Sequence, residues 1–149
     1  MLQDQLQNDL KQAQLARDNV RVSTLRLLLS EIHNAQIQSG PSESGLSDQD
    51  IISIIQKESK KRKEAAAGFR QGNREEQAQK EETELKVLES YLPAKLNNEE
   101  LTKLIEDTIN NVGAKNIEDI GRVMVVVMSR VKGQADGSVV SSIVREKLQ

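Results

Sequence analysis

The sequence predicts an all-α protein in two parts, a long hairpin-containing N-terminal part and a compact three-helix C-terminal domain. Apolar residues recur at helical spacing along most of the 149 residues. Capping residues and glycines separate these apolar stripes at regular points. Pro93 also follows Leu92 and disfavours helical geometry there, which ends the long helical part. We therefore expect an N-terminal helical domain over 1–92 and a C-terminal tail domain over 93–149.

The first two helices are predicted from two apolar stripes with a cap between them. The first stripe consists of Leu2, Leu6, Leu10 and Ala13. Asp18-Asn19 then offers an N-cap for a second helix. The apolar face of that helix runs from Val22 to Ala35, and Ser39-Gly40-Pro41 ends it.

The third and fourth helices are predicted to form a long antiparallel hairpin. Ser47 and Asp50 resemble a capping box, and the helix that follows runs to Phe69 and ends near Gly72. Asn73 then caps the fourth helix, whose apolar residues come late. The tip near Gly72 is very polar and cannot form a packed core. We expect it to project into solvent or to meet a partner.

Three short capped helices are predicted after Pro93. Their caps and stops are Asn97 with Glu100, then Gly113, Asn116, Gly133 and Asp136. The β-branched run 123–128 also suits a strand. No partner strand is evident elsewhere, so a helix is the better prediction for this run.

The composition argues against most catalytic chemistry. Cysteine is absent, which excludes a disulfide framework and a thiolate nucleophile. His33 is the sole histidine and lies among polar neighbours, so we expect a surface residue. No phosphate-binding or zinc-binding motif occurs. We expect no catalytic residues, no cofactor and no metal, although a site built only of carboxylates stays open.

The same composition gives expectations for location and charge. No stretch approaches the ~20 apolar residues of a transmembrane helix, and residues 1–5 carry no signal-peptide features. A cytoplasmic location without membrane contact is therefore expected. The net charge is −2 and the pI about 5.6, unlike the strongly basic balance of many nucleic-acid binders.

The basic run from Lys57 to Lys63 is the first candidate binding feature. Acids such as Glu75 and Glu81 on the next helix can pair with it across the hairpin, which favours a solvated, salt-bridged face. Contact with phosphate groups is the alternative interpretation.

The second candidate combines Gly121-Arg122-Val123-Met124 with the segment from Lys132 to Gly137. Residues 121–149 carry five cations against two acids, a net +3, whereas 93–149 balances at eight against eight. Gly121 inside a helix costs about 1 kcal/mol, so we expect another backbone to approach it closely. Gly133 and Gly137 bracket a turn whose amides can receive a phosphate. An ordinary corner between two helices is the alternative.

These segments resemble the GatB/YqeY domain family. The resemblance rests on 85–93, 96–101, 119–124 and 132–137, with further similarity over 24–28, 60–64 and 69–74. It therefore spans nearly the whole chain. It implies two helical parts and kinship with the C-terminal region of the B subunit of the tRNA-dependent amidotransferase, whose tail contacts tRNA. The catalytic part of that subunit has no counterpart here, so any carbon–nitrogen ligase activity with glutamine as amido donor would be accessory or inherited.

The leading hypothesis is a tRNA-associated binding module. Its expected phosphate contacts are Lys115, Arg122, Arg130 and Lys132, placed around Gly133. Gln134 stands where the family often carries a basic residue, which removes one charge from this turn. With so few aromatic residues, recognition would rely on RNA backbone and shape. One alternative is a helical adaptor that docks a protein through the polar hairpin near Gly72 or through the apolar faces of the C-terminal helices. The other is a working part of a glutamine-dependent amidotransferase.

Overall fold

The computed structural model describes residues 1–41 and 45–149. Over these ranges the chain forms α-helices and one 3-10 helix, and no strand occurs among the described residues, so the predicted all-α class is confirmed. The run 123–128 is helical. The contacts of the structure divide the chain into two compact units, unit 1 (Met1–Leu92) and unit 2 (Pro93–Gln149). Each unit is described by itself.

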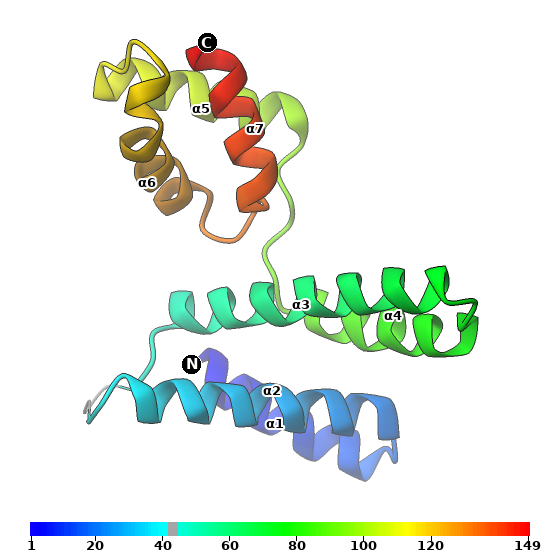
Figure 1. The fold of residues 1–149 in the computed structure, drawn as a ribbon. Helices are drawn as coiled ribbons and strands as arrows, with labels where there is room; N and C mark the ends of the chain where they lie inside the picture. The colour runs from blue at the N-terminus through cyan, green and yellow to red at the C-terminus, as the bar shows by residue number, and fades with distance from the viewer. Residues whose placement is uncertain (42–44) are drawn as a thin grey trace. The chain divides into compact units, whose positions relative to one another are not determined.

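Unit 1 contains four helices that form two hairpins (Figure 1). Their bounds are α1 (Leu2–Leu15), α2 (Asn19–Gln38), α3 (Asp48–Gln71) and α4 (Glu75–Glu89). α1 pairs with α2, α3 pairs with α4, and the two hairpins pack on one another within the unit. The predicted antiparallel hairpin of the third and fourth helices is therefore present.

The helix starts of unit 1 follow the predicted caps at two of three places. The Asp18 carboxylate accepts the Arg21 N–H at 3.1 Å, and Ser47 and Asp50 form both halves of a capping box. The prediction for Asn73 is wrong. Asn73 takes a φ of +59° in the turn, and α4 begins after Arg74 without a side-chain capping bond. A left-handed residue closes the short α3–α4 turn, and asparagine tolerates that geometry.

The core of unit 1 is aliphatic and draws on all four helices. Its buried members are Leu6, Leu25, Leu28, Ile32, Ile51, Ile55 and Leu88. Tyr91 packs against this cluster, and its hydroxyl donates to the Asp9 carboxylate at 2.6 Å. Burial, reinforced by this hydrogen bond, raises the pKa of Tyr91. The residues just after α4 are thereby fastened to α1.

Towards its tip, the α3–α4 hairpin is held together by small side chains and ion pairs instead of the aliphatic core. Ala66 and Ala78 are buried there, and small side chains let the two helices approach closely. Arg62 pairs with Glu81 and Glu84, both from α4. Residues 71–77, at the tip, are all exposed. The expectation of a polar tip without a packed core is borne out by these exposures.

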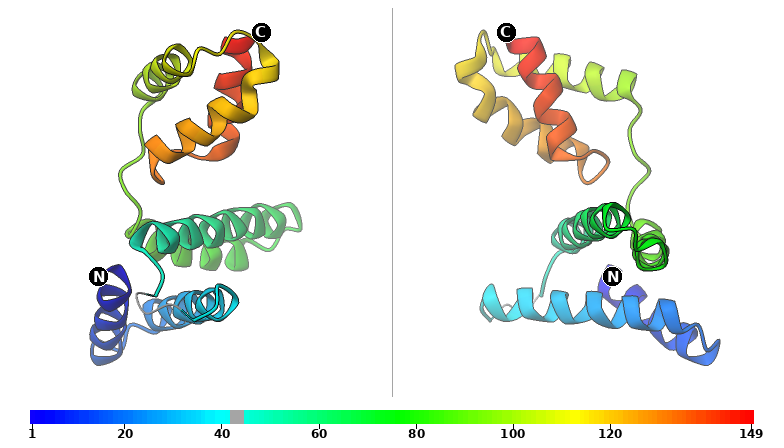
Figure 2. Two further views of the ribbon diagram at one scale, coloured as in Figure 1. Left: turned by 90° about the vertical axis from the view of Figure 1, so that its left-hand side faces the viewer. Right: turned by 45° about the vertical axis from the view of Figure 1, so that its right-hand side comes forward.

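Unit 2 consists of three α-helices and a short 3-10 helix (Figure 2). They are α5 (Asn98–Val112), η1 (Ile117–Asp119), α6 (Ile120–Val131) and α7 (Gly137–Leu148). The capping box of Asn97 with Glu100 is present, and Gly113 ends α5 at a φ of +70°. Asp136 caps α7 by accepting the Ser138 N–H at 2.9 Å.

The start of the middle helix of unit 2 differs from the prediction. Asn116 caps η1 rather than a long helix, accepting the Glu118 N–H at 3.0 Å. α6 follows only at Ile120. At the other end, the left-handed residue that ends α6 is Lys132, with a φ of +44°, and Gly133 follows at +85°.

The core of unit 2 is also aliphatic. Its buried members are Leu101, Ile105, Val123, Val127, Val131, Ala135, Val140, Val144 and Leu148. Near the start of the unit, before α5, the Leu96 N–H donates a hydrogen bond to the Gln134 carbonyl at 2.9 Å. That bond ties the entry segment to the turn between α6 and α7. Across the described ranges, the helices are all too short or too polar to traverse a bilayer.

Candidate nucleic-acid interface

Arg122 lies in the first turn of α6 and Lys115 precedes η1, and one carboxylate connects the two residues. The Asp119 side chain accepts the Lys115 backbone N–H at 2.9 Å and pairs with the Arg122 guanidinium at 3.2 Å. The hydrogen bond from the Lys115 amide, with further help from Asn116 and Arg122, lowers the pKa of Asp119. The Lys115 ammonium and part of the Arg122 guanidinium stay exposed.

Arg130 and Lys132 lie at the opposite end of the same helix. The Arg130 guanidinium donates to the hydroxyl of buried Thr108 on α5 at 3.2 Å, and the rest of its side chain is exposed. Lys132 is the exposed residue that ends α6. Within the described residues, no carboxylate lies within ion-pairing distance of Lys115 or Arg130.

The four predicted cations are therefore distributed along α6 and not gathered around Gly133. Arg122 and Arg130 are eight residues apart, which corresponds to about 12 Å along the helix axis. Exposed cations thus stand at the two ends of one helix. We call Lys115, Arg122, Arg130 and Lys132 the α6 strip.

Four of the eight acids of unit 2 lie on a different helix, and Glu118 and Asp119 lie on η1. α5 carries four acids against Lys103, whereas the segment from Ile120 onward carries five cations against two acids. One ion pair joins α7 to α5, between Lys147 and Glu106 at 2.8 Å. The hydrogen bond with Glu106 raises the pKa of Lys147. The neutral total charge thus conceals an acidic helix and a basic one.

The turn from Lys132 to Gly137 is less suited to a phosphate than the sequence suggested. The Gln134 N–H already donates to the Val131 carbonyl at 2.8 Å. The Asp136 carboxylate occupies the N-terminus of α7, where it accepts the Ser138 N–H. A negative group at that position repels a second anion. The geometry favours an ordinary capped corner at this turn, whereas the cations of the α6 strip remain accessible.

The expected close approach to Gly121 is wrong. A methyl group added at Gly121 meets no atom within 4 Å, and the residue is exposed in the first turn of α6. A glycine in the first turn of a helix bears less of the interior penalty, so no packing compensation is required.

The basic run of α3 separates into two groups. Arg62 and Lys63 face α4, where Arg62 pairs with Glu81 and Glu84 and Lys63 lies 3.6 Å from Glu89. Lys61 pairs with Glu58 one turn earlier at 3.2 Å. Lys57 and Lys60 are exposed, with no such pair among the described residues. The interpretation of a salt-bridged face therefore holds for most of the run.

Metal binding and histidine chemistry were the remaining possibilities for a site. No group of three or more histidine and acidic side chains in the described residues is placed to hold a metal ion. His33 is exposed on α2, as its polar neighbours indicated.

A family model described as Yqey-like protein matches residues 3–148. The chain belongs to the Yqey-like protein family. The resemblance seen in the motifs is therefore confirmed over nearly the full length of the chain.

Curated relatives of this Yqey-like chain include two kinds of named protein. "Altered inheritance of mitochondria protein 41, mitochondrial" from Pyrenophora tritici-repentis is 31% identical over 145 residues, 95% of this chain and 77% of the relative. The protein of the same name from Vanderwaltozyma polyspora is 32% identical over 74% of this chain and 60% of its own length. A protein from Methanobrevibacter smithii that is named as a subunit of a glutamyl-tRNA(Gln) amidotransferase is 40% identical over 58 residues, 36% of this chain and 9% of that protein.

These names correct one expectation. A cytoplasmic location was predicted, and it is contradicted because three relatives that each match 60% or more of this Yqey-like chain are named as mitochondrial proteins. A composition without an evident signal did not distinguish the two compartments. The match also spans only 60% and 47% of the length of two of these relatives, so it does not carry over their whole activity.

Proposed function

We propose that this Yqey-like protein is a tRNA-associated binding module that contacts RNA phosphates through the α6 strip. The observation that carries the proposal is the 40% identity over 58 residues with a protein named as a subunit of a glutamyl-tRNA(Gln) amidotransferase. That subunit is far longer than the matched segment, which covers 9% of it. The proposal therefore concerns binding, and it assigns no amidation chemistry to this chain.

The geometry of unit 2 supports this proposal through the placement of its charges. The α6 strip presents exposed cations at both ends of one helix, and four of the eight acids of unit 2 lie on α5. A polyanion is attracted to the first surface and repelled by the second. Both aromatic residues, Phe69 and Tyr91, lie in unit 1, so unit 2 offers no aromatic side chain for base stacking. Recognition would follow backbone and shape, with little sequence preference.

The test is a titration of tRNA with the full chain, followed by fluorescence anisotropy at several salt concentrations. Four phosphate contacts predict an affinity that falls by about a hundredfold between about 50 and about 200 mM salt. The double charge reversal Arg122→Glu with Lys132→Glu should weaken binding by at least about tenfold and make the salt dependence shallower.

A matched control is available within the same unit. The double reversal Lys95→Glu with Lys103→Glu changes the net charge equally, but both lysines lie outside the α6 strip. It should leave the affinity within about twofold of the original protein. Equal losses in the two double variants would mean that only net charge matters, and no loss in either would remove the α6 strip from RNA binding.

A helical adaptor is the second candidate, favoured by the complete exposure of residues 71–77 at the tip of the α3–α4 hairpin. In that case a protein partner contacts the tip and RNA has no part. Purification of the chain after ribonuclease treatment separates the two candidates. A defined protein that stays bound to the original chain, and is lost when residues 71–77 are replaced by a glycine-serine turn, would support the adaptor.

A further inference from the structure

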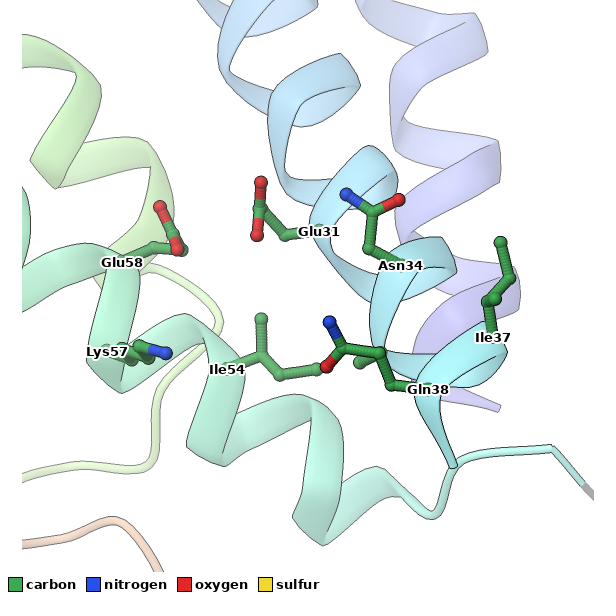
Figure 3. Close-up of a pocket in the computed structure, with 8 residues that line it drawn as sticks. Glu31, Asn34, Ile37, Gln38, Ile54, Lys57 and Glu58 are labelled. Atoms are coloured by element: carbon green, nitrogen blue, oxygen red, sulfur yellow. The ribbon is translucent and has the colours of Figure 1, made fainter. Parts of the chain in front are cut away.

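A polar groove lies between α2 and α3 of unit 1, far along the sequence from the α6 strip. Its volume is about 360 Å³. α2 contributes Glu31, Asn34 and Gln38, and α3 contributes Ile54, Lys57 and Glu58. In Figure 3 the carboxylates of Glu31 and Glu58 face one another across the groove. The volume falls in the range of small-molecule sites, about 300–1,000 Å³.

Most of the polar groups of this groove have no partner in the part of the chain that the structure describes. Among the described residues, the structure gives no hydrogen bond or ion pair to the side chains of Glu31, Asn34, Gln38 or Lys57. Glu58 is engaged, since Lys61 lies 3.2 Å from its carboxylate. Elsewhere on α3, Arg62 and Lys63 pair with acids of α4. Of the charges in the groove, Lys57 and Glu31 are therefore the ones without such a pair among the described residues.

The two kinds of charge lie at different places in the groove. Glu31 and Glu58 form an acidic end, whereas Lys57 and the amide of Gln38 lie on either side of Ile54 (Figure 3). A ligand that satisfies both places carries an ammonium group and a carboxylate. Between them, Ile54 offers an apolar surface for a short aliphatic segment.

We propose that this groove binds a small zwitterion of the α-amino acid or dipeptide class. The ammonium group of the ligand donates to Glu31 and Glu58, and its carboxylate accepts from Lys57. Asn34 and Gln38 supply amide groups, which suit the polar atoms of a peptide bond. This site is separate from the proposed RNA contact, which lies in the other unit.

The experiment is a titration of the isotope-labelled full chain with L-alanyl-L-alanine and, in parallel, with L-leucine. Both are followed by amide chemical shifts in nuclear magnetic resonance spectra. Saturable shifts at residues of α2 and α3 are expected for at least one of the two probes. The probe that binds more tightly shows whether the groove prefers a dipeptide or a free amino acid. Absence of saturable shifts with both probes at concentrations up to about 20 mM would overturn the proposal, because such affinities are near the weak limit for a specific site.

Blocked ligands test whether both charges are read. For the dipeptide, the N-acetyl form lacks the ammonium group and the C-terminal amide lacks the carboxylate. Each should bind about tenfold more weakly, the effect of losing one charge-assisted hydrogen bond. If only the N-acetyl form binds more weakly, the groove recognises the ammonium group alone and the zwitterion proposal fails.

Two single variants with matched controls place the site. Glu31→Gln and Lys57→Gln each remove one charge that lines the groove, and each should weaken the tighter probe by about tenfold. Glu64→Gln and Lys60→Gln remove the same charges from exposed positions of α3 outside the groove and should have no effect. Equal behaviour of the groove variants and the controls would overturn the assignment. The Arg122→Glu, Lys132→Glu protein should bind the probe normally, so this result is independent of the RNA proposal.

Discussion

The α3–α4 hairpin and unit 2 are both helical, yet different forces hold them together. Unit 2 encloses a continuous aliphatic core that includes Ile105, Val123 and Val127. The outer half of the hairpin has alanines at its contact and relies on Arg62 and Arg70, which pair with acids of α4. A protein with 36% hydrophobic and 30% charged residues can thus build one region from apolar burial and another from ion pairs.

This difference has a consequence for how each region responds to conditions. Apolar burial is insensitive to moderate salt, whereas ion pairs at a partly exposed surface are screened by it. The unfolding of the two units can also be followed separately, because Tyr91 and Phe69 both lie in unit 1. Tyrosine fluorescence therefore follows unit 1, and circular dichroism follows the helices of both units.

The largest expected effect is in the core of unit 2. Ile105→Ala removes a fully buried side chain and should lower the free energy of unfolding of unit 2 by about 3 kcal/mol. If 1–92 and 93–149 are independent domains, the Tyr91 fluorescence transition stays in place while part of the circular dichroism transition moves to lower denaturant. A simultaneous shift of both signals would contradict the two-domain prediction.

The next effect is in the ion-paired hairpin. Arg62→Met leaves Glu81 and buried Glu84 without their partner and should destabilise unit 1 by about 2 kcal/mol. Here the Tyr91 fluorescence transition should move, and its salt dependence should decrease. Lys60→Met removes an exposed charge two residues away and serves as the control, with no expected shift.

A smaller effect is expected where α4 is fastened to α1. Tyr91→Phe removes the hydroxyl that donates to Asp9 and should cost unit 1 about 1 kcal/mol, measured by circular dichroism in urea. In the original protein the raised pKa of Tyr91 means that the folded state prefers the neutral phenol. This contribution is complete below the ordinary tyrosine pKa of about 10 and is lost as pH rises through the raised value.

The smallest effect concerns the tip of the hairpin. Arg70 pairs with Glu75 at 3.0 Å and with Glu82 at 2.7 Å, and its hydrogen bonds lower the pKa of both carboxyl groups. The contribution of these pairs is present above the ordinary glutamate pKa of about 4.3 and is lost as pH falls through the lowered values. Arg70→Met should return both pKa values upward in a carboxyl titration by nuclear magnetic resonance, whereas Arg74→Met should not. Unchanged pKa values of Glu75 and Glu82 in Arg70→Met would show that other groups set them.

Local signals explain why most helix starts were predictable from the sequence. The caps at Ser47, Asn97 and Asp136 depend on residues within three positions, so the sequence alone contains the whole interaction. The 3-10 helix was missed because it depends on Asp119 reaching back to the Lys115 amide. The acids Glu118 and Asp119, two and three residues after Asn116, were the available signal for this shorter start.

The candidate sites depended more on tertiary structure. The cations of the α6 strip could be predicted as candidates from the sequence. Their position at the two ends of α6 could not, because it depends on η1 ending at Asp119 and α6 beginning at Ile120. The partners of Arg62 required the register of α3 against α4. The α2–α3 groove was not predicted, because Glu31 and Lys57 come from different helices; the polar spacing of Glu31, Asn34 and Gln38 on one helix was its only local signal.

The hydrogen bond between Leu96 and Gln134 has a mechanical consequence for unit 2. A pulling force transmitted along the chain from Pro93 reaches Leu96 before it reaches the first turn of α5. The Leu96 amide is anchored on the α6–α7 turn, so tension is first borne by that turn. The helices of unit 2 would begin to separate only after this anchor breaks, and the anchor acts as a mechanical clasp at the entrance of the unit.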